Sequence, residues 1–274
     1  MLTEKIMPYI RIMRPLNCFM TSFAIYITFL VFSGFSMNIK IPLFASLAGF
    51  FAAAGGNTIN DYVDYESDKI NHPDRPLPAG NMSQHTSLIY AMILFAIAVA
   101  TSVFIPATAV VILLTNIILL ILYELRFKKV GLSGNIIISY LVGSIFLFGG
   151  AISDNLYSGI YVFFSPFFIN LAREIYKDIE DMEGDKDRKT LPMKIGLRKA
   201  SHAAFFSVIV GIILSPIPYV YGVFSIYYMV VVAIASAGFL FAGIKGYSSP
   251  EKAGKGIKYF MLVALLSYIA GVIF

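Results

Sequence analysis

The chain has 274 residues, of which 58% are hydrophobic and only 14% are charged. With a mean hydropathy of +0.78, it has too few charges to cover a soluble globule of this size. The sequence therefore predicts a membrane protein, and the placement of its net charge of +5 gives no reason to expect a nucleic-acid partner.

Apolar stretches long enough to cross a hydrocarbon core of about 30 Å as helices recur along the whole chain. We expect the first stretch to remain as a membrane helix, because it is too long for a signal-peptide core and lacks a small-residue cleavage site. The predicted fold class is all-α, a polytopic membrane protein with nine transmembrane helices. These helices are expected near residues 16–36, 42–61, 86–104, 106–123, 135–153, 157–176, 202–220, 223–244 and 257–274.

The charged residues gather at one side of the predicted membrane. If the N-terminus is cytoplasmic, every Lys and Arg except Lys40 lies in a cytoplasmic segment, and every Asp and Glu except Asp154 lies on that side too. This distribution is the positive-inside bias of membrane proteins. We therefore expect a multi-pass protein of the cell membrane whose polar cap faces the cytoplasm.

Two acidic clusters follow the second and the sixth predicted helix and share one spacing of i, i+3 and i+7. An even number of crossings separates them, so they should emerge on the same side of the membrane. At about 100° per residue, each trio covers only roughly 60° of a helix surface. Because like charges at this spacing repel, we expect a cationic partner. The aspartates are Asp61, Asp64 and Asp68 in "NDYVDYESD", a face widened by Asn57 and Asn60, and Asp178, Asp181 and Asp185 in "DIEDMEGD".

Carboxylate clusters of this kind suit Mg²⁺, which takes a few carboxylates and completes its octahedron with waters and substrate phosphate oxygens. Such an ion neutralises the charge on a departing diphosphate. A calcium loop of the EF-hand type is rejected, because Pro192 stands where the bidentate Glu is required. Solvated helix ends are the plain alternative, which the matched spacing disfavours. Cys18, the only cysteine, excludes an internal disulfide and a cysteine-held zinc or iron–sulfur site in this chain alone.

Basic residues surround the acid in the predicted cap. Singly, each is better explained as an orientation signal, but together with the acid they favour a site for a metal and a phosphoester. They are Arg75 in "NHPDRPLPAG", Arg126, Lys128 and Lys129 in "LYELRFKK", and Lys177, Lys186, Arg188 and Lys189 beside the second cluster.

These motifs resemble those of the UbiA family of intramembrane prenyltransferases. The stretch "NDYVDYESD" is similar to the family's N-D-x-x-D-x-x-x-D, "DKINHPDRPLPAG" to its R-P-x-x-x-G continuation, and "DIEDMEGD" to its second D-x-x-D-x-x-x-D. Helix count and motif order agree over essentially the whole chain. The resemblance implies a single transmembrane domain over residues 1–274, with Mg²⁺ as cofactor.

The resemblance also implies roles for individual residues. "RPLN" looks like the family's entry to its first helix, and "LYELRFKK" looks like its loop between the fourth and fifth helices. The implied catalytic residues are Asp64, Asp68, Asp181 and Asp185, which are metal ligands together with Asn60 and, in support, Asp61 and Asp178. The implied substrate-binding residues are Arg14, Asn17, Asn57, Asn60, Arg75, Tyr123, Arg126, Lys128, Lys177, Arg188 and Lys189.

Within the family, "REIYKDIEDMEGDKDRKTLP" and "INHPDRPLPAG" look most like archaeal enzymes that add a second geranylgeranyl chain to a lipid precursor. The implied reaction moves the geranylgeranyl group of geranylgeranyl diphosphate to the free hydroxyl of geranylgeranylglyceryl phosphate, which makes the diether core of archaeal membrane lipids. An aromatic acceptor such as a hydroxybenzoate, a naphthoate or haem is the alternative. An ion-coupled transporter is disfavoured, because its acid is expected near the membrane midplane, often in inverted repeats.

Overall fold

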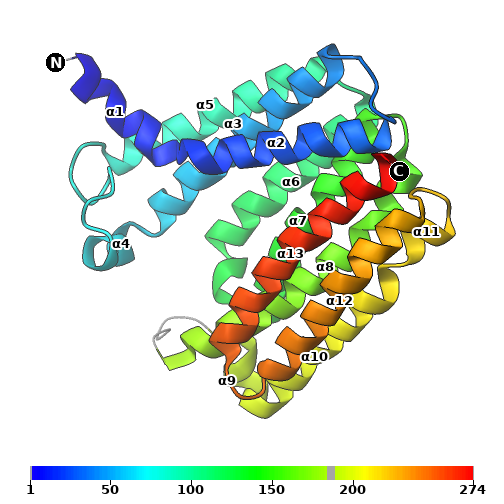
Figure 1. Ribbon diagram of the computed structural model, residues 1–274. Helices are drawn as coiled ribbons and strands as arrows, with labels where there is room; N and C mark the ends of the chain where they lie inside the picture. Colours follow the sequence, from blue (N-terminus) through cyan, green and yellow to red (C-terminus); the bar gives the residue numbers. More distant parts are fainter. Residues whose placement is uncertain (1, 184–188, 274) are drawn as a thin grey trace. The chain divides into compact units, whose positions relative to one another are not determined.

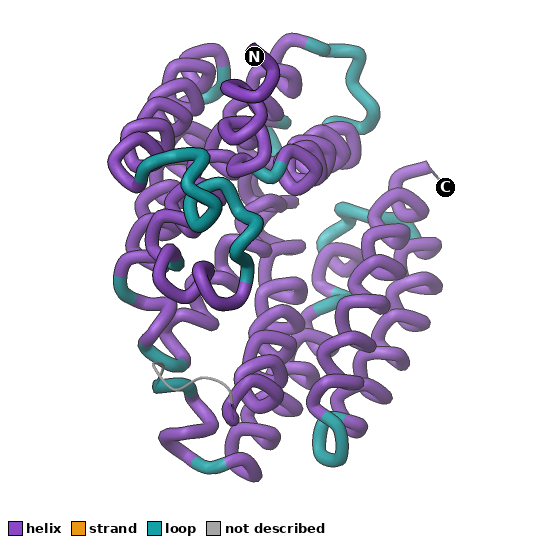
Figure 2. Tube along the Cα trace, turned by 90° about the vertical axis from the view of Figure 1, so that its left-hand side faces the viewer, coloured by secondary structure: helices purple, strands orange, loops and turns teal. Residues whose placement is uncertain are grey.

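The computed structural model describes residues 2–183 and 189–273 of the chain. Helices and turns make up these residues, and no strand occurs among them (Figure 2). The chain divides into two compact units: unit 1 consists of Met1–Phe29 and Ser36–Leu125, and unit 2 of Leu30–Phe35 and Arg126–Phe274.

Unit 1 is built around α3, against which α1, α5 and α6 all pack; α5 runs alongside α3 in Figure 1. Small residues allow this close approach. A Cβ on Gly55 would lie 2.7 Å from the Phe95 ring of α5, and one on Gly56 would lie 2.3 Å from Leu120 of α6. The last turns of α3 are therefore held against two neighbouring helices. The helices are α1 (Leu2–Met13), α2 (Pro15–Phe32, whose last turn belongs to unit 2), α3 (Lys40–Val63), α4 (Tyr65–Asn71), α5 (Gln84–Thr101) and α6 (Ala107–Leu125).

A sharp break at Arg14 separates α1 from α2. Arg14 has φ +52, a left-handed conformation that is uncommon for a residue other than glycine. Pro15, the first residue of α2, disfavours the helical conformation in the residue before it and has no N–H to continue the ladder. The carbonyl oxygen of Met13 accepts hydrogen bonds from Nδ2 of Asn57 (2.7 Å) and from the thiol of Cys18 (3.0 Å) instead. We expected the first helix only from residue 16, so α1 is an addition to the predicted elements.

Unit 2 is built around α8, which packs against α7, α10 and α13, while α12 packs against α13; these helices run side by side in Figure 1. A Cβ on Gly159 would lie 2.5 Å from the carbonyl oxygen of Phe146, so α7 and α8 approach backbone to backbone. The side chains that α8 contributes to the buried core include Ile169, Ala172 and Ile175. The helices are α7 (Leu132–Ile152), α8 (Leu156–Glu180), α9 (Leu191–Ile195), α10 (Leu197–Leu214), α11 (Ile217–Val220), α12 (Ile226–Lys245) and α13 (Pro250–Ile273).

Within the described part of the chain, eight helical segments are long and apolar enough to cross a membrane. They contain α2, α3, α5, α6, α7, α10, α12 and α13 and match eight of the predicted spans. The remaining predicted span, 157–176, is helical as part of α8, but α8 is not among the eight, and charged residues occur in it from Arg173 onward. The prediction of an all-α, polytopic membrane protein is confirmed, whereas the count of nine spans is not established.

Candidate active site

The first acidic motif runs from the end of α3 into α4, and the two helices are joined at Asp64. The N–H of Asp64 donates to the carbonyl of Asn60 (2.9 Å), and the N–H of Asp68 donates to that of Asp64 (2.8 Å), so the helical path continues across the joint. Arg75 lies 3.5 Å from Oδ1 of Asp61 and 2.6 Å from Oδ2 of Asp68. The prediction that the aspartates share one face is therefore confirmed for Asp61 and Asp68.

Two arginines neutralise the buried carboxylates of this motif. Asp61 and Asp68 are only 2% and 3% exposed. Asp61 forms ion pairs with both Arg14 and Arg75, and Asp68 forms one with Arg75. Because burying an unpaired carboxylate costs several kcal/mol, these contacts allow the acid to be buried. The cationic partner expected from the sequence is, within unit 1, this pair of half-buried guanidinium groups.

Lys69 follows Asp68 in the sequence, but its charge is held by Glu66 of the same helix. Its ammonium lies 3.0 Å from each carboxylate oxygen of Glu66 and 4.2 Å from the ring centroid of Tyr65. The hydrogen bond to Glu66 raises the pKa of Lys69, so this lysine stays protonated on the exposed side of α4.

Asn60 connects the arginines to α6. Its Oδ1 accepts a hydrogen bond from Arg14 (3.1 Å), and its Nδ2 lies 3.1 Å from both carboxylate oxygens of Glu124. Glu124 is buried, at 6% exposure. A role for Glu124 was not predicted from the sequence. Its signal was a single carboxylate at the end of an apolar helix, a position where ionisable residues usually serve a function.

Asn57 and Asn17 were both predicted as substrate contacts. Nδ2 of Asn57 donates to the carbonyl of Met13 and lies 3.7 Å from the Cys18 sulfur, so the structure shows it supporting the break between α1 and α2. The side chain of Asn17 is exposed. A direct substrate contact of either residue stays a prediction.

The second acidic motif lies at the end of α8 and repeats the local structure of the first. Asp181 follows the last residue of α8 with φ −81 and ψ −5, close to the φ −83 and ψ 4 of Asp64. Its N–H donates to the carbonyl of Lys177, four residues back. Asp178 accepts a hydrogen bond from Nδ2 of the buried Asn135 on α7 (2.8 Å). In both motifs, then, the first aspartate is bound by a side chain of its own unit and the middle one caps a helix.

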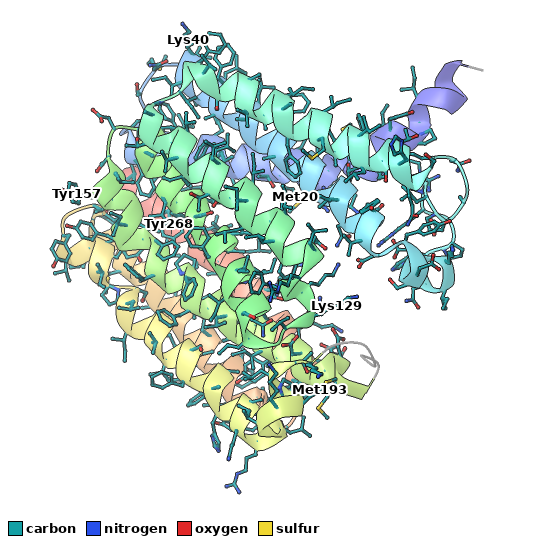
Figure 3. The ribbon with its side chains drawn as sticks, turned by 180° about the vertical axis from the view of Figure 1, so that it is seen from behind. Met20, Lys40, Lys129, Tyr157, Met193 and Tyr268 are labelled. Atoms are coloured by element: carbon teal, nitrogen blue, oxygen red, sulfur yellow. The ribbon has the colours of Figure 1, made fainter. Side chains whose placement is uncertain are left out.

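The other predicted site residues lie near these helix ends in sequence, and several fall on the surface. The N–H of Lys189 donates to the carbonyl of Lys129 (3.2 Å), which ties the chain after the second motif to the loop before α7. Figure 3 shows Lys129 and Met193 at one end of the helices of unit 2 and Tyr157 at the other. Tyr123 and Lys128 are half-buried, whereas Arg126, Lys177 and Lys189 are exposed. Asp185, Lys186 and Arg188 lie outside the described residues.

The donor atoms of both motifs fit a hard divalent cation in kind, since all are carboxylate or amide oxygens. Over residues 2–183 and 189–273, no group of three or more His, Cys, Asp or Glu side chains is close enough to hold a metal ion. In unit 1 this agrees with the arginine contacts of Asp61 and Asp68. The first motif belongs to unit 1 and the second to unit 2, and the structure determines each within its own unit.

Residues 19–266 match the UbiA prenyltransferase family. The chain belongs to this family, and it is an intramembrane prenyltransferase that crosses the membrane several times. It is 38% identical to a digeranylgeranylglyceryl phosphate synthase of Methanosphaera stadtmanae, over 96% of this chain and 98% of that protein. It is 37% identical to the protein of the same name from Methanocaldococcus jannaschii, over 98% of each chain.

Solved structures share the fold over nearly the whole length. A structure of digeranylgeranylglyceryl phosphate synthase matches with a TM-score of 0.91 and 37% identity, over 98% of this chain and 99% of that one. A UbiA homologue from Archaeoglobus fulgidus bound to GPP and Mg²⁺ matches with a TM-score of 0.77 and 20% identity, over 96% and 98%. The second likeness is one of fold alone.

Proposed function

We propose that this prenyltransferase transfers the geranylgeranyl group of geranylgeranyl diphosphate to the free hydroxyl of geranylgeranylglyceryl phosphate and releases diphosphate. The product is the diether core of archaeal membrane lipids. The observation that carries the choice of substrates is the similarity to the curated synthases, which extends over nearly the full length of both chains at 37–38% identity.

We further propose that the two acidic motifs serve the same diphosphate. Their equal spacing and the matching backbone at Asp64 and Asp181 support a shared role. The residues that would hold Mg²⁺ are Asn60, Asp64, Asp68, Asp181 and Asp185. When bound, Mg²⁺ supplies neutralisation of the charge that develops on the departing diphosphate. The metal is also seen in a UbiA homologue bound to GPP, which supports the assignment.

In this proposal the chain's own residues bind and orient the two substrates. Arg14 and Arg75 are fixed by Asp61 and Asp68, so their remaining N–H groups are positioned in advance to donate to phosphate oxygens. The exposed or half-buried cations Arg126, Lys128, Lys177 and Lys189 would bind phosphate groups of the two substrates. Asp61 and Asp178 support the site through their hydrogen bonds to Arg14 and Asn135.

The reaction breaks the allylic carbon–oxygen bond, and the electron pair of that bond leaves on the diphosphate. The oxygen of the acceptor hydroxyl attacks the allylic carbon, and its proton passes to a base. The products are the ether, diphosphate and one proton. Positioning of the hydroxyl against the allylic carbon is the main contribution expected of the cationic residues.

The acceptor is tested with purified protein, Mg²⁺, labelled geranylgeranyl diphosphate and a panel of acceptors. We expect efficient transfer to geranylgeranylglyceryl phosphate and much slower transfer to its dephosphorylated alcohol, which lacks the charge-assisted contacts. Efficient transfer to 4-hydroxybenzoate or a naphthoate, with no transfer to the glycerol phosphate, would overturn the acceptor while leaving the prenyltransferase intact.

Removal of the metal gives a second test in the same assay. Because every proposed ligand is an oxygen, a hard ion is required. Excess EDTA should abolish transfer, and Mg²⁺ or Mn²⁺ should restore it. Full transfer in excess EDTA would contradict the metal assignment.

A further inference from the structure

The side-chain amide of Asn60 lies between two neighbours of opposite hydrogen-bonding character. Arg14 donates to Oδ1 (3.1 Å), and both oxygens of Glu124 accept from Nδ2 (3.1 Å each). A guanidinium has only donors, and an ionised carboxylate has only acceptors. The two neighbours therefore permit one orientation of the amide. A turn of 180° would set donor against donor and acceptor against acceptor.

Burial makes this choice of orientation firm. Glu124 is 6% exposed and Asp61, the other partner of Arg14, is 2% exposed. Asn60 and Arg14 are half-buried, but water is largely kept from the carboxylate of Glu124, and on that side a mismatched polar pair is not relieved by solvent. The amide oxygen is consequently held on the side of Arg14 and Asp61.

We infer that Glu124 is a positioning residue, which turns the oxygen of Asn60 rather than its NH₂ group toward the diphosphate and its metal. The presence of the metal in this inference rests on the proposed function. The orientation of the Asn60 amide rests on contacts within unit 1. An amide oxygen is a ligand for Mg²⁺, whereas an amide NH₂ in the same place repels a cation. Partners that orient a ligand typically change metal affinity by about 10- to 100-fold when they are lost.

Glu124 also joins α6 to α3, and this contact is separable from orientation. Glu124→Gln keeps the shape of the side chain and one acceptor oxygen, so it can still hydrogen-bond to Asn60 across the two helices. It also places an NH₂ group next to Nδ2 of Asn60, where the carboxylate had only acceptors. Because Gln can either accept from Nδ2 or donate to Oδ1, it keeps the contact between the helices but no longer favours one orientation of the Asn60 amide.

The swapped pair Asn60→Asp/Glu124→Gln removes the need for orientation. A carboxylate at position 60 presents an oxygen whichever way it is turned, and the amide at position 124 donates to it. Asn60→Asp alone places two carboxylates against each other and is expected to impair the site. The swapped pair should therefore recover metal affinity if Glu124 acts by orienting Asn60.

The experiment measures binding of Mn²⁺ by electron paramagnetic resonance, with purified protein and the unreactive analogue geranylgeranyl thiodiphosphate. Wild type, Glu124→Gln and the swapped pair are compared. Glu251→Gln is the matched control, because Glu251 lies on the surface of α13 and pairs with Lys255. Melting temperatures are recorded for each variant.

We expect Glu124→Gln to bind Mn²⁺ about tenfold more weakly or worse with an unchanged melting temperature, and the swapped pair to recover most of the affinity. Wild-type affinity in Glu124→Gln would overturn the inference. If Glu124→Gln melts early, the swapped pair decides, and failure to recover affinity overturns the inference. Absence of Mn²⁺ binding by the wild type would instead remove the metal site of the proposed function, and this inference with it.

Discussion

Arg14 combines a strained backbone with a well-held side chain. A residue other than glycine with φ +52 carries a cost of about 1–3 kcal/mol. The ion pair with Asp61 and the hydrogen bond to Asn60 hold its guanidinium, and the bond from Asn57 to Met13 holds the backbone just before it. These contacts hold Arg14 in its strained conformation and keep its guanidinium group at the end of α3.

We predict that Asn57→Leu destabilises the protein and lowers turnover. The substitution keeps the volume but leaves the Met13 carbonyl without its 2.7 Å partner, a loss of about 1–3 kcal/mol. It also frees the turn that places Arg14, so binding of geranylgeranyl diphosphate should weaken. Thermal unfolding and a substrate titration measure both effects. Asn81→Ala, at an exposed position of the same unit, is the control, and an equal effect of the two substitutions would count against this role.

At the scale of single residues, site residues can be predicted from the sequence where a spacing repeats or a known motif occurs. The aspartates were found because one spacing occurs twice, and Arg14 and Arg75 because they fall in recognisable motifs. Glu124 and Asn135 were missed, since neither belongs to a repeated spacing, and only the fold shows that they contact Asn60 and Asp178.

At the scale of elements, both acidic motifs end the helix that has the most helical neighbours in its unit. In unit 1, α3 packs against α1, α5 and α6, and in unit 2, α8 packs against α7, α10 and α13 and also contacts α9 and α11. The long helices were predicted because apolar runs of membrane length are unambiguous. The short helices α1, α4 and α9 were not, because segments outside the apolar runs carry no such signal, and the division of the predicted span 202–220 into α10 and α11 was also missed.

We predict that Gly159→Ala destabilises unit 2, whereas Gly254→Ala does not. A Cβ at Gly159 would lie 2.5 Å from the Phe146 carbonyl oxygen, a backbone atom that cannot turn aside, while nothing lies within 4 Å of one at Gly254. Crowding of this kind costs about 1–3 kcal/mol, and the exchange in an open helix gains up to about 1 kcal/mol. Thermal unfolding in detergent compares the two variants. Equal melting temperatures would contradict the close backbone approach of α7 and α8 at Gly159.

At the scale of the whole molecule, the distribution of charge predicts a cytoplasmic N-terminus and cytoplasmic polar loops. Cysteines introduced at Asn81 and Lys199 should resist an impermeant thiol reagent in intact cells and react once the membrane is opened. A cysteine at Tyr157, which is 74% exposed, should react in intact cells. Cys18 is buried and gives the background. The reverse labelling pattern would place the acidic motifs on the other side of the membrane.

The class of fold and the family were within reach of the sequence, because hydropathy and two long motifs extend over most of the chain. The number of spans was not, since α8 is of membrane length but carries charged residues from Arg173 to its end. The pairing of Asp61 with two arginines was also out of reach, because it depends on how α1, α3 and the loop before α5 come together.

The measurement that most directly tests the central claim, that the two acidic motifs carry one prenyl transfer, compares Asp64→Ala and Asp181→Ala at saturating Mg²⁺. Both residues lie at helix ends, so the packed cores should survive their loss. We predict that each substitution abolishes transfer of labelled geranylgeranyl groups to geranylgeranylglyceryl phosphate while the melting temperature stays near that of wild type, as it does in the control Glu251→Ala. Near wild-type transfer by either aspartate variant would contradict the claim.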